Sequence, residues 1–436
     1  MSRSKGERVL NAVNQRSNNR LVFLDNLRFF LVLCVVLQHS SNAYSSLTWW
    51  PVAENDSSII AEWFRAVIDA FAMPLLFYIA GYFAIPTIQK GSINRFLKGK
   101  LKRLGIPWLV CILTICPILP LIYHYTRNNL TLSTSYWELW IELMKRAAQL
   151  DFGIIYSMND LMQSNQFYQR YMWFLSLLIL FFIVFSVLYR LKGGWFEPED
   201  RPLSSEDPSI LSTLKLVVMV GSLTFLCSFL TIGTMFLLAP KLSNPEPFFS
   251  LGNVIQFRPS RIFLFIVYFG LGILTYKKKW IERGKFPGHF TTWLISFVIV
   301  LFCFLYVRHL MLNGPEHLER VSGIVLWFFL NFLTVSSLGL FVSLAIRYWN
   351  RPTKANQSLA ANSYSMYMTH YVFVVGFQLV LFTFPGIPGA IKFGIVSGLS
   401  IVCSYLVSRF LVTPFPRIAF TGAVGLFIVM SLVIRS

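Results

Sequence analysis

Apolar runs long enough to cross a membrane recur along the whole chain, separated by short polar connections. A helix needs about 20 apolar residues to cross the hydrocarbon core of a bilayer, and backbone polar groups in lipid must be satisfied within each segment. Ten runs meet or approach that length, and an eleventh, 419–434, is shorter. The pattern therefore predicts an all-α fold, a polytopic membrane helix bundle with 10–11 transmembrane helices. The ten runs are 22–45, 58–85, 104–125, 168–190, 211–238, 260–276, 290–310, 322–346, 358–383 and 391–412.

The composition agrees with a membrane protein. Of the 436 residues, 55% are hydrophobic and only 13% are charged, whereas soluble chains are about a quarter charged. The net charge of +19 does not indicate nucleic-acid binding, because the cations lie in short connections between apolar runs, where they orient the spans. No grouping of Cys and His has the spacing of metal ligands, so we expect no metal site.

The distribution of Lys and Arg predicts the orientation in the membrane. Basic residues concentrate in the N-terminal tail, in the connection 86–103, and in the loops after the sixth and eighth spans. With ten alternating spans these segments share one side, which is therefore cytoplasmic. We divide the chain into a cytoplasmic basic tail, 1–20, and a single transmembrane domain, 21–436, with no signal peptide and no internal repeat. The amphipathic stretch 137–150 (WELWIELMKRAAQL) is expected to lie along the outer surface.

The first predicted span carries three ionisable residues. At 100° per residue, Asp25, Arg28 and His39 fall within about 60° of one another on a helical wheel. Charged groups in membrane helices normally face the protein interior or a wet cavity, so this stripe predicts a polar cavity beside the helix. The alternative is that Asp25 and Arg28 only anchor the helix at the interface, while His39 caps its outer end.

Five stretches, in order, resemble the acyltransferase 3 family of membrane acyltransferases. LDNLRFFLVLCVVLQHS (24–40) matches the first-helix signature, Leu-Asp-x-Leu-Arg followed by a histidine eleven positions after the arginine. The other four are FAMPLLFYIAGYFA (71–84), FLKGKLKRLGIPWLV (96–110), YMWFLSLL (171–178) and NSYSMYMTHYVFV (362–374). Glucan succinyltransferases and sugar O-acetyltransferases are among the members that the chain resembles. Two positions depart from the family pattern, because Lys100 replaces an arginine and Ala80 replaces a serine.

The resemblance implies transfer of an acetyl or succinyl group from cytoplasmic acyl-CoA to a hydroxyl of a sugar or glycan, in the bacterial inner membrane. Acyl-CoA would be a donor substrate, and no tightly bound cofactor is expected. A sugar hydroxyl needs a base, and histidine titrates near neutral pH, so His39 is the candidate base. Asp69 is its candidate acidic partner, with an i, i+4 pair to Arg65 as the alternative. A homo-oligomer remains open.

Basic residues on the cytoplasmic side are candidates for the donor phosphates. Arg28, Lys100 and Arg103 are predicted to bind acyl-CoA, although a lysine lacks the planar fork that arginine offers to phosphate. Ordinary loop charge is the alternative for the lysines of this segment, and a structural pair with Asp25 is the alternative for Arg28. The candidate cavity or substrate-binding residues are Asp25, Trp173, Arg261, Tyr364 and His370; Arg258 and Asn331 are further candidates.

Several of these residues also have purely structural interpretations. Trp173 fits an aromatic belt at the membrane surface. His370 fits a buried histidine bonded to a tyrosine, and Asn331 fits a helix-to-helix hydrogen bond. The competing function is a secondary transporter or exporter of a sugar or polysaccharide precursor, which would have a similar composition and number of spans. Transporters are often built from internal repeats, and none is visible here.

Overall fold

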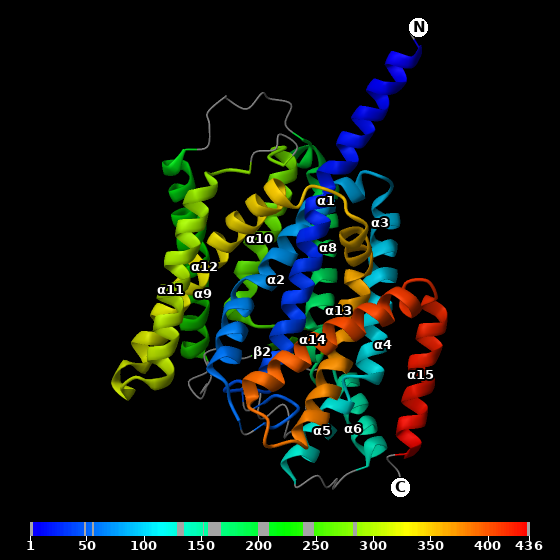
Figure 1. The fold of residues 1–436 in the computed structure, drawn as a ribbon, viewed down its shortest axis with the longest axis vertical. Coiled ribbons are helices and arrows are strands. Elements are labelled where there is room, and N and C mark those ends of the chain that lie inside the picture. The colour runs from blue at the N-terminus through cyan, green and yellow to red at the C-terminus, as the bar shows by residue number, and fades with distance from the viewer. Residues whose placement is uncertain are drawn as a thin grey trace.

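The computed structural model describes residues 3–433, except 48, 55, 129–134, 151, 156–166, 199–208, 239–247 and 282–285. Helices dominate this part of the chain (Figure 1). They are α1 (Arg3–Asn42), α2 (Ile59–Ile88), α3 (Ile93–Lys100), α4 (Ile106–Thr114), α5 (Ile118–Arg127), α6 (Tyr136–Ala148), α8 (Trp173–Leu191), α9 (Ile210–Leu238), α10 (Pro259–Lys277), α11 (Phe290–Asn313), α12 (Glu319–Tyr348), α13 (Lys354–Phe382), α14 (Gly389–Val407) and α15 (Pro416–Val433).

The helices confirm the predicted membrane bundle. Within the described residues, 10 helical stretches are long and apolar enough to cross a bilayer. The third differs from its predicted range, because it runs from Ile93 to Arg127 and joins α3, a π-helical turn (Leu101–Gly105), α4 and α5. The basic KGKLKR stretch (98–103), which the hydrophobicity pattern had placed in a loop, forms the end of α3 and the start of the π-helical turn. The eleventh predicted run forms α15, which is not among the ten.

A small antiparallel sheet lies at one end of the bundle, and the sequence pattern did not predict it. Its strands are β1 (Phe152–Ile155), β2 (Phe248–Leu251) and β3 (Ile255–Phe257), in the order β1-β2-β3. Phe152 pairs with Leu251, and Phe249 pairs with Phe257. These strands are too short to show a period-2 pattern beside long apolar spans. The sheet and the helices α5 and α6 lie at the end of the bundle opposite the N-terminus of α1 (Figure 1).

Two central helices, α2 and α10, cross with their backbones in close contact. A Cβ atom added to Gly272 would lie 2.0 Å from the carbonyl oxygen of Tyr78, and one added to Gly81 would lie 2.1 Å from the carbonyl oxygen of Phe269. Small residues at such crossings are typical of membrane helix packing. This crossing fixes the relative positions of two helices that carry charged side chains into the interior.

The remaining long helices surround this pair. α1 packs against α2 and α13, while α9, α11 and α12 form a group at the left of Figure 1. α6 begins with a capping box formed by Ser135 and Glu138 and packs Leu139 and Leu143 against Leu121 of α5. The amphipathic stretch 137–150 is thus largely helical, and its placement along the outer membrane surface stays a prediction.

Candidate functional site

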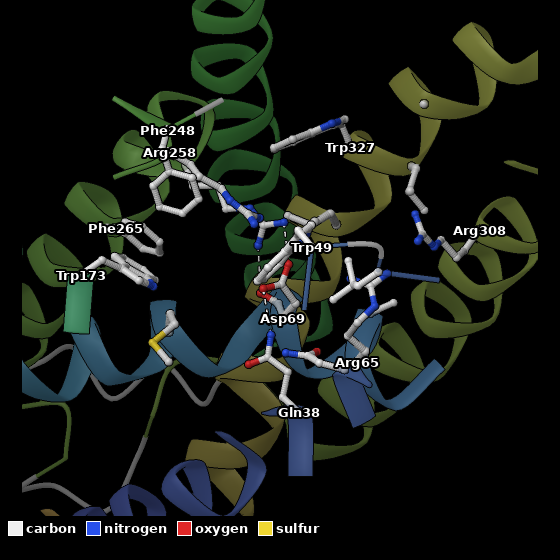
Figure 2. A pocket seen from close by; sticks show the side chains of 18 of the residues that line it. Gln38, Trp49, Arg65, Asp69, Trp173, Phe248, Arg258, Phe265, Arg308 and Trp327 are labelled. Carbon is white, nitrogen blue, oxygen red and sulfur yellow. Dashed lines mark hydrogen bonds and ion pairs between the residues drawn. The ribbon is translucent and has the colours of Figure 1, made fainter. Parts of the chain in front are cut away.

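A large cavity lies inside the half of the bundle that is opposite the N-terminus of α1. Its volume is about 830 Å³, and residues of α1, α2, α8, α9, α10, α11, α12 and α13 line it. His39, Asp69, Trp173 and Arg261, four of the residues singled out in the sequence, all contribute to the lining. Of the predicted stripe on the first span, His39 borders this cavity, whereas Asp25 and Arg28 do not. Figure 2 shows Asp69 near the centre of the lining, with Trp173 to one side.

Two histidines from distant helices form a hydrogen bond at the cavity wall. His39 Nδ1 lies 2.8 Å from His370 Nε2, and the two rings are parallel within 5°. His370 is fully buried, and its Nδ1 lies 2.7 Å from the carbonyl oxygen of Tyr367. A carbonyl oxygen can only accept, so His370 Nδ1 carries a proton and donates it. In the neutral pair, His370 Nε2 must then accept, and His39 Nδ1 must be the donor.

This arrangement sets the tautomer of His39. With the proton on Nδ1, the lone pair of a neutral imidazole is on Nε2. Within the described part of the chain, no hydrogen bond is made to that nitrogen, and His39 itself lines the cavity. A basic nitrogen is therefore available to a molecule in the cavity. The predicted bond between His370 and a tyrosine is made to the backbone carbonyl of Tyr367 and not to a tyrosine hydroxyl. The other hydrogen-bond partner of His370 is His39, the candidate base.

Aromatic side chains hold the His39 ring in place. Trp50 stacks on it at 5.8 Å between ring centroids, and Tyr371 meets it edge-on at 5.2 Å. Gln378 of α13 accepts a hydrogen bond from Trp50 Nε1 at 2.8 Å and donates to the carbonyl oxygens of His39 and Ser40. The loop after α1 and the end of α1 are thereby tied to α13 around the histidine pair.

Asp69 lies near His39 but forms its hydrogen bonds elsewhere. Its carboxylate accepts from Arg261 Nη2 at 2.7 Å and from Gln38 Nε2 at 3.1 Å. Arg261 Nη1 also donates to the Asp69 backbone carbonyl at 3.0 Å. The alternative pairing with Arg65 is wrong, because Arg65 binds Glu62 instead. Asp69 can act on the charge of His39 through space, but no hydrogen bond orients the ring from this side.

Sequence reasoning missed a buried carboxylate that bridges two helices at the far side of the cavity. Glu62 of α2 is only 4% exposed and binds both Arg65 of the same helix and Arg308 of α11. The available signal was a general one, because an ionisable residue within an apolar span is a candidate functional residue by default. Arg170, Tyr367 and Tyr371 were also missed, and all three line the cavity.

The other predicted residues form a second group, nearer the N-terminus of α1. Arg28 forms the predicted ion pair with Asp25 at 3.1 Å, and it also donates to Ser363 Oγ and the Ala360 carbonyl oxygen of α13. The carbonyl oxygen of Arg103 accepts a hydrogen bond of 2.6 Å from the Tyr364 hydroxyl. None of these residues lines the cavity.

Three further candidates have distinct positions. Lys100 lies over the rings of Phe96 and Phe182, at 5.1 Å and 4.0 Å from their centroids, and does not line the cavity. Arg258, just before α10, lines the cavity beside Phe248. Asn331 is buried and donates to the Trp327 carbonyl oxygen within its own helix, so it makes neither the predicted cavity contact nor a described bond to a neighbouring helix.

The end of the cavity near the sheet is closed by neutral and basic groups. Tyr168 is outside the membrane spans, and burial raises the pKa of its hydroxyl, so this lining group stays uncharged at neutral pH. Arg170 is only 5% exposed and lies over the Tyr168 ring, with 5.3 Å to the ring centroid. Of the described lining residues, five are arginines and one, Asp69, is acidic. The cavity is therefore suited to a polar or anionic molecule.

Comparisons with known proteins converge on one family. The acyltransferase 3 family model, described as an acyltransferase domain, matches residues 21–409. "Glucans biosynthesis protein C" from Escherichia coli (strain K12) is 36% identical over 93 residues, 21% of this chain and 24% of that protein. The protein of the same name from Shigella dysenteriae serotype 1 (strain Sd197) is 34% identical over 93 residues, with the same coverage. The match thus spans about a quarter of each relative's length. No solved structure matches the chain significantly.

Proposed function

Because the chain belongs to the acyltransferase 3 family of membrane acyltransferases, we propose that it transfers an acetyl or succinyl group from cytoplasmic acyl-CoA to a hydroxyl of a sugar or glycan. The observation that carries this proposal is the chain of hydrogen bonds from His39 through His370 to the Tyr367 carbonyl. It leaves His39 Nε2 as a proton acceptor at the wall of a cavity that has room for a sugar ring.

The direct form of the reaction requires one base and one leaving group. His39 Nε2 takes the proton of the acceptor hydroxyl while the hydroxyl oxygen attacks the thioester carbonyl carbon. The carbon–sulfur bond then breaks, the thiolate of coenzyme A leaves, and His39 returns the proton to that sulfur. The products are an ester and free coenzyme A. Asp69 lines the same cavity as His39, and a carboxylate there favours the imidazolium that exists between the two proton transfers.

The second polar group is proposed to hold the donor. Arg28 and Arg103 lie close enough for their charges to interact, and two guanidinium groups suit the phosphates of coenzyme A. His39 lies about 16 Å further along α1 than Arg28, at a rise of 1.5 Å per residue. Coenzyme A carries its thioester at the end of a long flexible arm, which suits a donor bound at one end of the interface between α1 and α13 and reacting at the other. The predicted orientation, with the N-terminus in the cytoplasm, places these phosphates on the cytoplasmic side.

The family match favours an enzyme over the alternative, a sugar or polysaccharide transporter. The test is the purified protein in proteoliposomes with acyl-CoA, labelled in the acyl group, outside and a sugar acceptor inside. Labelled ester on the trapped acceptor, with release of free coenzyme A, supports the proposal. Movement of the acceptor across the bilayer without ester formation would support the transporter instead. Protein-free liposomes and a heat-denatured sample control for leakage and chemical acylation.

A further inference from the structure

The side of the cavity farthest from Trp173 holds two arginines whose side chains are fixed by one buried carboxylate. Glu62 accepts from Nε and Nη2 of Arg308 at 3.2 Å and 2.7 Å, and from the same two nitrogens of Arg65. The Glu62 carboxylate also accepts hydrogen bonds from the backbone N–H and the hydroxyl of Ser46. Two cations thus share one anion, and the group has a formal excess of one positive charge.

The geometry of this clamp leaves one edge of each guanidinium for the cavity. Both arginines use Nε and Nη2 on Glu62, and both line the cavity. Among the described residues, the Nη1 group of Arg308 has only a weak contact with the Met311 sulfur at 3.9 Å. Two preorganised guanidinium edges that face one space are suited to a phosphate group, which offers several acceptor oxygens. Figure 2 shows Arg65 and Arg308 on the other side of Asp69 from Trp173 and Phe248.

The cavity wall beside this clamp is apolar and reaches the surface of the bundle between α9 and α12. Along one part of their length these helices are in contact, because the Phe225 and Phe328 rings lie 5.4 Å apart, and Gly221 lies against Phe332. The same antiparallel register puts Phe229 opposite Ile324. These two residues line the cavity, yet they are 46% and 49% exposed on the molecular surface.

Two glycines mark the same opening. Gly233 of α9 and Gly323 of α12 both line the cavity, and a Cβ atom added to either would meet no atom within 4 Å. Both helices are long and apolar enough to span a membrane, and the two glycines lie near the ends of these spans, so the opening lies where one leaflet's headgroups meet its hydrocarbon chains. An apolar passage that leads from lipid to a cationic clamp fits a molecule with a hydrocarbon chain and an anionic headgroup. A soluble sugar has no chemistry that matches this passage.

We propose that the acceptor is a lipid-anchored sugar phosphate, with its phosphate held by Arg65 and Arg308 and its hydrocarbon chain between α9 and α12. This inference rests on the proposed acyl transfer to a sugar hydroxyl and specifies the acceptor of that reaction. The sugar beyond the phosphate extends toward His39, which lines the same cavity. The clamp lies at the end of the bundle opposite the N-terminus of α1, so the lipid enters from the leaflet at that end.

Binding can be measured without any acyl donor. The full-length protein in a neutral detergent is titrated with a polyprenyl phosphate, with the matching uncharged polyprenol and with inorganic phosphate, and complexes are counted by native mass spectrometry. The proposal expects the polyprenyl phosphate to bind at least roughly tenfold more tightly than either other probe, because it combines apolar burial with charge-assisted hydrogen bonds. Equal binding of the polyprenol, or equally tight binding of inorganic phosphate, overturns it.

Variants separate the clamp from the passage. Arg65→Gln should weaken polyprenyl phosphate binding roughly tenfold while leaving polyprenol binding unchanged, because one charged hydrogen-bond partner is lost. Gly323→Leu should weaken binding of both lipids by filling the passage, and it places its side chain in open space, so the fold is retained. Gly398→Leu of α14, another glycine with no atom within 4 Å, is the control and should bind normally. Unchanged binding in both Arg65→Gln and Gly323→Leu contradicts the proposal.

The same titration distinguishes this inference from the proposed function. His39→Ala should bind the polyprenyl phosphate like the wild type, because His39 is not part of the clamp. Tight, clamp-dependent lipid binding by a protein that transfers no acyl group would support the lipid site and reject the reaction. Acyl transfer to a soluble sugar without clamp-dependent lipid binding would support the reaction and reject the lipid site.

Discussion

His39 of α1 and His370 of α13 share a hydrogen bond of 2.8 Å, although 331 positions separate them in the sequence. The same two helices are also joined by Arg28, which lies eleven positions before His39 in α1 and donates to Ser363 of α13 at 3.3 Å. One interface therefore carries both polar groups, with the proposed base at one end and the proposed donor site at the other.

His370 is expected to act as a positioning residue rather than as the base. His370→Ala should lower kcat roughly 100-fold through loss of orientation of His39, with little change in the KM for either substrate. The pH profile of kcat should change as well, because both tautomers of His39 become available. His370→Gln keeps an acceptor for the His39 proton and should recover part of the activity.

Thr369→Ala on the neighbouring position of α13 is the matched control, since the one described side-chain hydrogen bond of Thr369 goes to the Ser365 carbonyl of its own helix. Steady-state kinetics between pH 5.5 and 8.5 provide the measurement. Equal losses of kcat in His370→Ala and His370→Gln, with an unaltered pH profile, would indicate that His370 only supports the fold.

Arg28 is expected to affect the donor and not the acceptor. Arg28→Gln removes the charge that is proposed to meet the coenzyme A phosphates, so the KM for acyl-CoA should rise roughly tenfold. The KM for the acceptor should stay the same. Lys90→Gln, which removes an exposed charge from the same predicted side, controls for general surface charge. A rise in the acceptor KM alone would contradict the assignment.

A buried ion pair holds the loop that carries Trp49 and Trp50 over the cavity. Lys392 of α14 is fully buried and donates to Glu54 at 2.7 Å, while the backbone of Gly389 donates to Asp56. Lys392→Met should destabilise the protein by about 3 kcal/mol or more, because it leaves a poorly solvated carboxylate without its cation. Thermal melting in detergent measures this, and Glu54→Gln combined with Lys392→Met should recover much of the loss. A double variant no more stable than Lys392→Met would contradict the pairing.

The crossing of α2 and α10 should tolerate no side chain at its closest point. Gly272→Ala would place a Cβ atom 2.0 Å from the Tyr78 carbonyl oxygen, so the helices must separate. We expect a loss of stability of about 1–3 kcal/mol and weaker activity, because Asp69 and Arg261 lie on these two helices. Gly270→Ala is the control on the same helix, since its Cβ would meet no atom within 4 Å. Equal melting temperatures for the two variants would show that the crossing is looser than described.

Much of the bundle was predictable because membrane spans are encoded locally. Long apolar runs determine helices without help from distant residues, so the number of spans and most of their positions agree with the sequence. The basic stretch 98–103 was predicted to be a loop because of its charge. It belongs to the continuous helical stretch of the third span, where Lys100 packs over aromatic rings. The short sheet depends on pairing between β1 and β2, and no local pattern reveals such pairing.

The candidate site was predictable only one helix at a time. The stripe on α1 identified His39 and indicated a cavity, and an intramembrane histidine marked His370 as a candidate. That the two form a hydrogen bond depends on how α1 packs against α13, which the sequence of neither helix specifies. The partner of Asp69 was missed for the same reason, because Arg261 approaches it from α10 rather than from the next turn of α2.

The most direct test of the account concerns the nitrogen that His39 presents to the cavity. Purified His39→Ala and its control Asn42→Ala, a cavity-lining change one turn further along α1, are compared with wild type for transfer of labelled acyl groups from acyl-CoA to a sugar acceptor. Loss of general-base catalysis should lower the transfer rate of His39→Ala by roughly 10²–10⁴-fold, with partial rescue by added imidazole, whereas Asn42→Ala stays active. Transfer at the wild-type rate by a folded His39→Ala protein would contradict the account.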